Sequence, residues 1–193
     1  MLCARRQHRV LAAITSALRR TCRTAVDPII CDILSALDTG CIAALAMLNL
    51  SAAFDTIDHT ILLQRLQTSF GLNGTVLSWF CSYLDQRWQH VSHRGKQSAT
   101  SDVQFGVPQG SVLGPLLFVL YTADIVNIIA CQGLSAHQYA DDIQVYDRCR
   151  PNDATSLCLE LGGCIEQVAD WMNINRLQLN AAKTEFMLSL IHI

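Results

Sequence analysis

Two adjacent aspartates, Asp141 and Asp142, stand between apolar and β-forming residues in the segment Tyr139-Ala140-Asp141-Asp142. Charged groups resist burial unless they are paired or bind a cation, so this pair requires an explanation. Carboxylate oxygens suit a hard divalent cation, and Mg²⁺ is usually held by one or two protein carboxylates beside substrate phosphates. The alternative interpretation is an ordinary acidic β-turn, because aspartate is common in turns.

A β-hairpin is the element that would position these acids. The flanking pattern predicts one strand at residues 137–139, a tight turn at residues 140–142 and a second, half-buried strand at residues 143–146. A hairpin tip would hold both carboxylates at a fixed point above a sheet.

The rest of the chain predicts further strands and helices around this hairpin. The apolar run Cys41–Leu48 is typical of a strand buried on both faces, and the loop Gly106–Gly110 lets the backbone approach a ligand closely. The order of elements indicates an α+β fold with an antiparallel sheet and helices packed on one face. Helices are predicted from residue 27 to 40, 58 to 71, 75 to 83, 112 to 130 and 152 to 173, a hairpin from 87 to 105, and a last strand from 183 to 188.

Charge is unevenly distributed along the 193 residues. The formal net charge of -2 gives no support to a free-standing nucleic-acid binder, which is usually basic. Residues 1–26 nevertheless hold six arginines and no acid. This segment is interpreted as an amphipathic mitochondrial presequence, a phosphate-binding surface, or the remnant of a larger protein.

The nine cysteines predict reduced thiols in an intracellular compartment, cytoplasmic or nuclear, because their number is odd and none forms a CxxC pair. The longest apolar candidate for a membrane span, residues 112–123, contains Gly114 and Pro115 and then meets Asp124. We therefore expect no membrane association.

Four segments in order resemble the reverse transcriptases of non-LTR (LINE-type) retrotransposons. The resemblance runs from about residue 25 to 188, and four motifs in the right order are far more specific than any one. A weaker match at Ser16–Arg19 resembles the end of the fingers region. The four segments are Leu48–His59, Phe105–Phe118, Tyr139–Asp142 and Trp171–Glu185.

The resemblance implies a palm domain of an RNA-directed DNA polymerase, a nucleotidyltransferase from a transposable element. Its implied partners are an RNA template, a DNA primer and deoxynucleoside triphosphates, and its implied cofactor is Mg²⁺ or Mn²⁺, as two ions. Residues 27–188 would form the palm, residues 1–26 a basic remnant of the fingers or an unrelated leader, and residues 189–193 a truncated tail, with no thumb.

The resemblance also assigns roles to single residues. Asp141 matches the catalytic, metal-binding acid of the hairpin, and Asp142 matches its less central neighbour. Gln109 and Gly110 match the loop that contacts template and nucleotide.

Three further assignments rest on the same resemblance. Phe54 matches the bulky residue that screens the incoming sugar, although core packing would also explain a phenylalanine there. Lys183 matches a lysine near the triphosphate, with a solvated strand end as the alternative. Arg19 matches a phosphate-contacting arginine of the fingers.

Asn49 is the main departure from the family pattern, which has aspartate at this position. An amide offers one neutral carbonyl oxygen in place of a charged carboxylate with two oxygens, so the site loses a full charge where dications must gather. The sequence therefore predicts the fold with little or no polymerase activity.

Other classes of function remain open at this point. A catalytically dead palm could serve as a nucleic-acid or protein interaction module, or the chain could be a non-functional element relic without partners. A two-carboxylate nuclease is a further alternative, with His137 as the candidate base.

Overall fold

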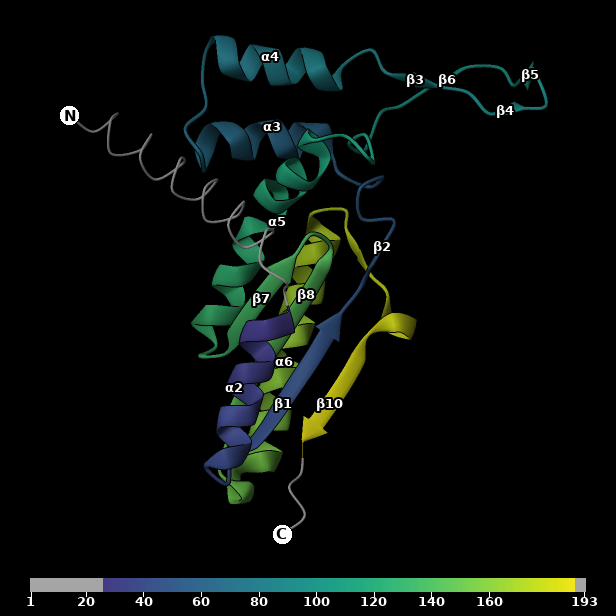
Figure 1. Cartoon of the computed structure of the whole chain (residues 1–193). Helices are drawn as coiled ribbons and strands as arrows, with labels where there is room; N and C mark the ends of the chain where they lie inside the picture. Colours follow the sequence, from purple (N-terminus) through teal and green to yellow (C-terminus); the bar gives the residue numbers. More distant parts are fainter. Residues whose placement is uncertain (1–25, 190–193) are drawn as a thin grey trace.

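The computed structural model describes residues 26–189, and Arg19 and the rest of the Arg-rich segment lie outside these residues. Within this range the main antiparallel sheet has four strands in the order β10-β1-β8-β7 (Figure 1). They are β1 (Ile42–Leu48), β7 (Ser135–Tyr139), β8 (Asp142–Cys149) and β10 (Glu185–Ser189).

Strand β1 lies in the middle of the sheet, which explains its continuous apolar sequence. It pairs with β8 from Ile42 opposite Cys149 to Leu48 opposite Ile143, and with β10 on its other side. A strand that is flanked on both edges and covered on both faces has no solvated side, so period-two alternation is lost.

The hydrophobic core lies between one face of this sheet and the helices α5 (Leu113–Cys131) and α6 (Ala154–Ile174). Ala44, Ala46 and Leu48 of β1 and Ile143 and Val145 of β8 belong to this core. They are joined by the buried helical side chains Leu117, Phe118, Tyr121, Ile125, Leu161 and Met172.

Helix α2 (Val26–Asp38) corrects the expectation that helices cover a single face of the sheet. Tyr146 stands opposite Leu45, on the face away from Val145, and its hydroxyl hydrogen-bonds Asp32 of α2 at 3.0 Å. Burial and the adjacent Asp32 carboxylate raise the pKa of Tyr146 to about 12, so the phenol remains protonated and donates this bond. Helix α2 therefore packs on the second face, at the end of β8 far from the hairpin turn.

A second group of elements stands beyond the hairpin end of the sheet (Figure 1). Helix α3 (His59–Thr68) begins at Asp58, whose carboxylate accepts hydrogen bonds from Thr60 N and Ile61 N, as the sequence predicted. Helix α4 (Thr75–Leu84) packs beside α3, and an extended arm follows it. The arm is made of β3 (Trp88–Gln89), β4 (Ser92–His93), β5 (Lys96–Gln97) and β6 (Ser101–Asp102).

The remaining short elements connect these parts. Strand β2 (Leu50–Ser51) pairs with β9 (Gln178–Leu179) beyond the end of β1. The 3₁₀ turn η1 (Pro151–Asp153) leads into α6. A second one, η2 (Ala181–Lys183), precedes β10, so Lys183 lies in a turn and not in the strand that the sequence predicted for residues 183–188.

Helix α5 is long and apolar enough to cross a membrane by length and composition, the one such helix in residues 26–189. The sequence had suggested that no stretch would qualify. Its side chains Leu117, Phe118 and Ile125 are fully buried in the core. A central position in the core accounts for the apolar composition of α5.

Candidate active site

The hairpin turn carries the two candidate acids. Tyr139 pairs with Asp142, so the turn consists of Ala140 and Asp141, and Asp142 is the first residue of β8. The sequence had placed Asp142 in the turn itself. Ala140 has φ +52°, a left-handed conformation that costs a non-glycine residue about 1–2 kcal/mol. Such a turn persists only because surrounding contacts hold it.

Helix α5 supplies one of these contacts through Gln138. The side-chain amide of Gln138 donates to Thr122 Oγ1 at 2.6 Å and to the carbonyl oxygen of Ala140 at 3.1 Å. Thr122 is fully buried and donates in turn to the Phe118 carbonyl oxygen at 2.9 Å. The acidic turn is thereby fastened to the core helix. Sequence reasoning did not identify Gln138 or Thr122, although Gln138 directly precedes the acidic motif.

The register of the sheet brings position 49 to the acids. The two strands are antiparallel, and Leu48 lies opposite Ile143. Asn49, the residue after Leu48, therefore lies beside Asp142, the residue before Ile143, at the end of the sheet. Both residues line a hollow of about 230 Å³ together with Lys183. Met47, Leu48, Ile143, Gln144 and Glu185 complete its lining. The hollow opens on the sheet face away from α5 and α6, because Asn49 alternates with Leu48.

Asp141 is adjacent to this hollow but is not among its lining residues. Burial, and secondly the negative charge of Asp141, raise the pKa of Asp142 above its ordinary value of 3.8. The two carboxylates therefore repel one another, and each would be stabilised by a cation between or beside them.

The donor atoms at this end of the sheet are those that a hard cation prefers. Asp141 and Asp142 offer carboxylate oxygens, and Asn49 offers an amide oxygen. Gln144 Oε1 is buried, lines the same hollow and has no hydrogen-bond partner among the described residues. No group of three or more His, Cys, Asp and Glu side chains that could hold a metal occurs within residues 26–189. Glu185 adds a further carboxylate to the lining. These oxygen donors fit a magnesium ion that would draw its remaining ligands from water or substrate phosphate.

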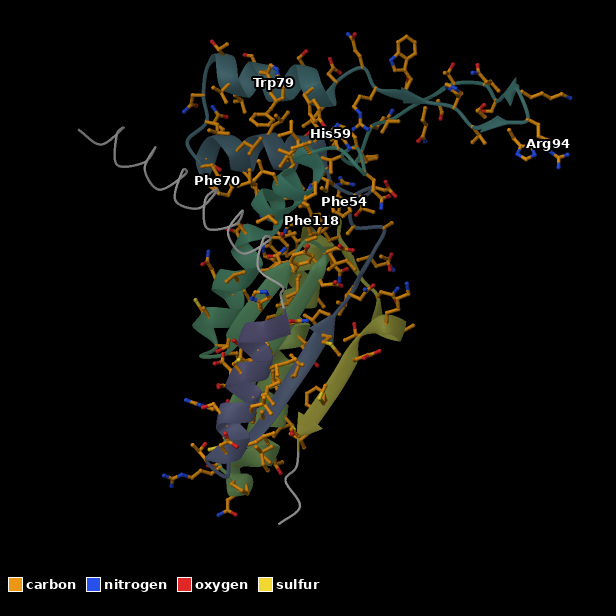
Figure 2. The ribbon with its side chains drawn as sticks, in the orientation of Figure 1. Phe54, His59, Phe70, Trp79, Arg94 and Phe118 are labelled. Atoms are coloured by element: carbon orange, nitrogen blue, oxygen red, sulfur yellow. The ribbon has the colours of Figure 1, made fainter. Side chains whose placement is uncertain are left out.

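Phe54 lies outside the hollow and packs on the core. Its ring centroid is 5.2 Å from that of Phe118, and the two rings are close in Figure 2. Phe54 is only half-buried, so part of its surface remains accessible.

The glycine loop is pressed against the backbone of the segment that carries Phe54. The amide of Gly106 donates to the Ile57 carbonyl and that of Val107 to the Phe54 carbonyl, each at 2.8 Å. A Cβ on Gly106 would lie 2.8 Å from Asp55 Cα and from the Phe54 oxygen. His59 Nε2 and Arg87 Nη1 both hydrogen-bond the Gly106 carbonyl, at 2.7 and 3.0 Å. Sequence reasoning assigned no role to His59 or Arg87.

Gln109 and Gly110 are exposed in the same loop, just before α5. Neither lines the hollow beside Asp142, and Lys183, which does, is also exposed. The structure therefore joins Asn49, Asp142 and Lys183 in one hollow, holds Asp141 next to it, and sets Phe54, Gln109 and Gly110 on the neighbouring loops.

The fold is similar to that of solved telomerase structures. The described architecture is similar to telomerase from Candida tropicalis truncated from its C-terminal domain, with a TM-score of 0.68 and 10% identity, over 98% of this chain and 41% of that one. Telomerase from Candida albicans gives a TM-score of 0.65 at 13% identity, over 94% of this chain and 35% of the other. At these identities the likeness concerns the fold alone.

Sequence comparison identifies the family. The family described as "Reverse transcriptase (RNA-dependent DNA polymerase)" matches residues 6–191. This chain belongs to the reverse transcriptase family, which confirms the resemblance found in its motifs.

The curated relatives are polymerases of mobile elements. The RNA-directed DNA polymerase from mobile element jockey of Drosophila funebris is 35% identical over 117 residues, which are 58% of this chain and 13% of that protein. The jockey polymerase of Drosophila melanogaster is 31% identical over 72% of this chain and 15% of its own length. A probable polymerase from the X-element of the same species is 35% identical over 53% of this chain and 11% of its length. This chain thus spans less than a sixth of these relatives.

Proposed function

We propose that this chain forms the palm of a non-LTR retrotransposon reverse transcriptase, in which Asp141 and Asp142 bind the catalytic magnesium and Asn49 weakens that binding. The single observation that carries the proposal is the position of Asn49 beside Asp142 at one end of the sheet, set by the pairing of Leu48 with Ile143. The family of the chain implies divalent metal ions, a template, a primer and deoxynucleoside triphosphates.

Each residue of the proposed site has a distinct role. Asp141 and Asp142 supply the negative charge that holds Mg²⁺ or Mn²⁺, and Asn49 adds an uncharged oxygen. The metal that these residues would hold would lower the pKa of the primer 3′-hydroxyl and stabilise the charge of the leaving pyrophosphate. Lys183, in the same hollow, would neutralise triphosphate charge.

The residues on the neighbouring loops would position the substrates. The accessible part of Phe54 would contact the incoming sugar, and its packing on Phe118 would hold it in place. Gln109 and Gly110, exposed at the start of α5, would contact the template and the nucleotide. Arg19, outside the described residues, is proposed as a phosphate contact on the family motif alone.

A primer-extension assay tests the proposal with an RNA template, a DNA primer, deoxynucleoside triphosphates and either Mg²⁺ or Mn²⁺. Removing a preorganised electrostatic contribution to a transition state typically costs 10²–10³-fold in rate. We therefore expect Asn49→Asp to extend the primer about 100-fold faster than the natural chain, and the double variant Asn49→Asp/Asp141→Asn to be inactive.

Two outcomes would contradict this. Equal and robust synthesis by the natural chain and by Asn49→Asp would show that the amide does not impair the site. A folded Asn49→Asp variant without any synthesis would refute the polymerase function itself and leave an interaction module or an element relic.

A further inference from the structure

The arm, defined as residues 87–103, extends from the helical end of the molecule away from the other elements (Figure 1). Its root is the pairing of β3 with β6, and its outer part is the pairing of β4 with β5. Every residue in these four strands is exposed. A two-stranded ribbon without a hydrophobic face is marginally stable in water, so a partner that contacts it would add to its order.

The charge of the arm differs from that of the whole chain. Residues 87–103 contain Arg87, Arg94 and Lys96 and a single acid, Asp102 at the root, whereas the chain has a net charge of -2. Arg87 is used at the root, where it donates to the Gly106 carbonyl. Arg94 and Lys96 are exposed, and neither forms an ion pair within residues 26–189. The outer arm therefore presents a positive surface that matches a polyanion.

The turn at the tip holds Arg94 in an unfavourable conformation. His93 pairs with Lys96, so Arg94 and Gly95 form a two-residue turn with φ +48° and +76°. Positive φ at both positions defines a type I′ turn, in which asparagine, aspartate or glycine is preferred at the first position. An arginine there costs about 1 kcal/mol or more. Figure 2 places Arg94 at the outermost point of the arm.

An aromatic side chain accompanies these cations. Trp88 is 72% exposed near the root of the arm. Aromatic rings beside a basic track are the features with which proteins bind single-stranded nucleic acid, because any base can stack on such a ring. An acidic peptide would be matched by the charge alone and would not account for the exposed indole.

The root of the arm is fixed to the loop of the candidate site. Val103 N donates to the Arg87 carbonyl at 2.8 Å, and Phe105 forms a β-bridge with Asp58. Gly106, the next residue, begins the loop that carries Gln109 and Gly110. A strand bound at this loop would therefore pass the base of the arm.

We infer that the arm is a contact for single-stranded RNA, in which Arg94 and Lys96 bind backbone phosphates and Trp88 stacks on an unpaired base. This inference rests on the proposed function for the identity of its ligand, which is the unpaired template next to the site.

Equilibrium binding of the whole chain to a labelled RNA–DNA hybrid with a single-stranded RNA overhang tests the inference at several salt concentrations. Each phosphate contact on a single strand contributes about 0.7 to the slope of log K against log salt. Arg94→Ala/Lys96→Ala should therefore flatten the slope by about 1.4. Trp88→Ala should weaken binding about 5- to 150-fold without changing the slope.

A matched control removes the same charge elsewhere. Arg148→Ala/Arg150→Ala replaces two exposed arginines at the far end of β8 and should leave the slope nearly unchanged. Circular dichroism and thermal unfolding would establish that all variants are folded.

The outcomes separate the arm from the polymerase function. An unchanged slope and affinity for Arg94→Ala/Lys96→Ala, or the same loss in the control, would overturn the inference, as would absence of binding by the natural chain. Primer extension by Asn49→Asp reports on the active site independently. Adding Asp141→Asn to Asn49→Asp should abolish extension, while the slope of log K against log salt should stay that of the natural arm.

Discussion

Asn49 and Asp142 are neighbours at the ends of two strands, and only Asp142 carries a charge. Without metal, an acid at position 49 would add a third negative charge next to Asp141 and Asp142 and would be repelled by both. Asparagine therefore relieves electrostatic repulsion in the free protein while it reduces the attraction for a cation. Stability and metal binding make opposite demands on this position.

Asp142 itself provides a pH-dependent prediction. Its pKa is raised in the folded state, so the folded protein binds more protons than the unfolded chain between pH 3.8 and the raised value. The contribution of Asp142 to stability consequently falls as pH rises through this window. We expect Asp142→Asn to be more stable than the natural chain at pH 7 and to lose that advantage below pH 3.8, as measured by thermal unfolding in metal-free buffer.

Magnesium should oppose this stability advantage of Asp142→Asn over the natural chain. A cation that binds the folded state stabilises it by mass action. Addition of Mg²⁺ should raise the melting temperature of the natural chain more than that of Asp142→Asn, and most for Asn49→Asp. An equal rise for all three proteins would show that the ion binds elsewhere.

The bond between Gln138 and Thr122 should stabilise the acidic turn. Thr122→Val keeps the shape of the side chain but removes the hydroxyl, and we expect a loss of about 1–2 kcal/mol in the free energy of unfolding by urea. The same substitution in a Gln138→Met background should cost less, since the hydrogen bond is already absent. Equal losses in both backgrounds would show that the bond contributes nothing.

The residues of the candidate site differed in how well the sequence predicted them. Asp141, Asp142 and Asn49 have oxygen-bearing side chains and lie at or next to the ends of predicted strands. Residue type, strand pattern and family motif therefore predicted them as site residues. Gln138, Thr122 and His59 act through contacts with backbone or with each other, and a glutamine or threonine in an apolar segment gives no signal of its partner. Only the packing of α5 against β7 brings Gln138 to Thr122.

At the scale of elements, the glycine loop that carries Gln109 and Gly110 lies close to the segment after β2 that carries Phe54. Gly106 combines φ +82° with backbone atoms 2.8 Å from where a Cβ would stand. These two constraints can be separated, because Gly133 has φ +80° and open space around it.

Gly106→Ala should therefore be much more harmful than Gly133→Ala. Gly133→Ala should lower the free energy of unfolding by about 1–2 kcal/mol because of its left-handed conformation. Gly106→Ala should lose the same amount and about 1–3 kcal/mol more because of the clash. Urea unfolding measures both losses. Equal losses would mean that the loop moves away freely and that its contact with Phe54 and Asp55 is not required.

Most elements were predicted from sequence, since strand β1, the acidic hairpin and helices α3 to α6 follow from apolar periodicity and turn residues. The position of α2 on the second face of the sheet was not predicted. Its apolar stripe indicates a buried side but not which surface buries it. In the structure, the hydrogen bond from Tyr146 to Asp32 connects α2 to this face of the sheet, and these two residues are 114 positions apart in the sequence.

At the scale of the whole molecule, Arg65 of α3 connects the helical end of the molecule to the two core helices α5 and α6. Its guanidinium donates to the Tyr121 carbonyl, binds Asn175 Oδ1 at 2.7 Å and pairs with Asp124 at 3.1 Å. It also lies 4.7 Å from the centroid of the Trp171 ring. One side chain of α3 thus contacts both α5 and the end of α6.

Loss of this connection should loosen the molecule as a whole. Hydrogen bonds to charged groups contribute about 1.5–3 kcal/mol each, so Arg65→Met should lower the free energy of unfolding by about 2 kcal/mol or more. The exposed Arg148→Met is the control and should change it by less than about 0.5 kcal/mol. A broadened, less cooperative transition for Arg65→Met would indicate that the two ends unfold separately.

The asparagine at the end of β1 also bears on the history of the chain. Asparagine and aspartate are almost identical in size, so either side chain fits the space at position 49. Their codons differ by one base, so under the proposed function a single nucleotide change would separate a site that lacks one charge from a site that has it.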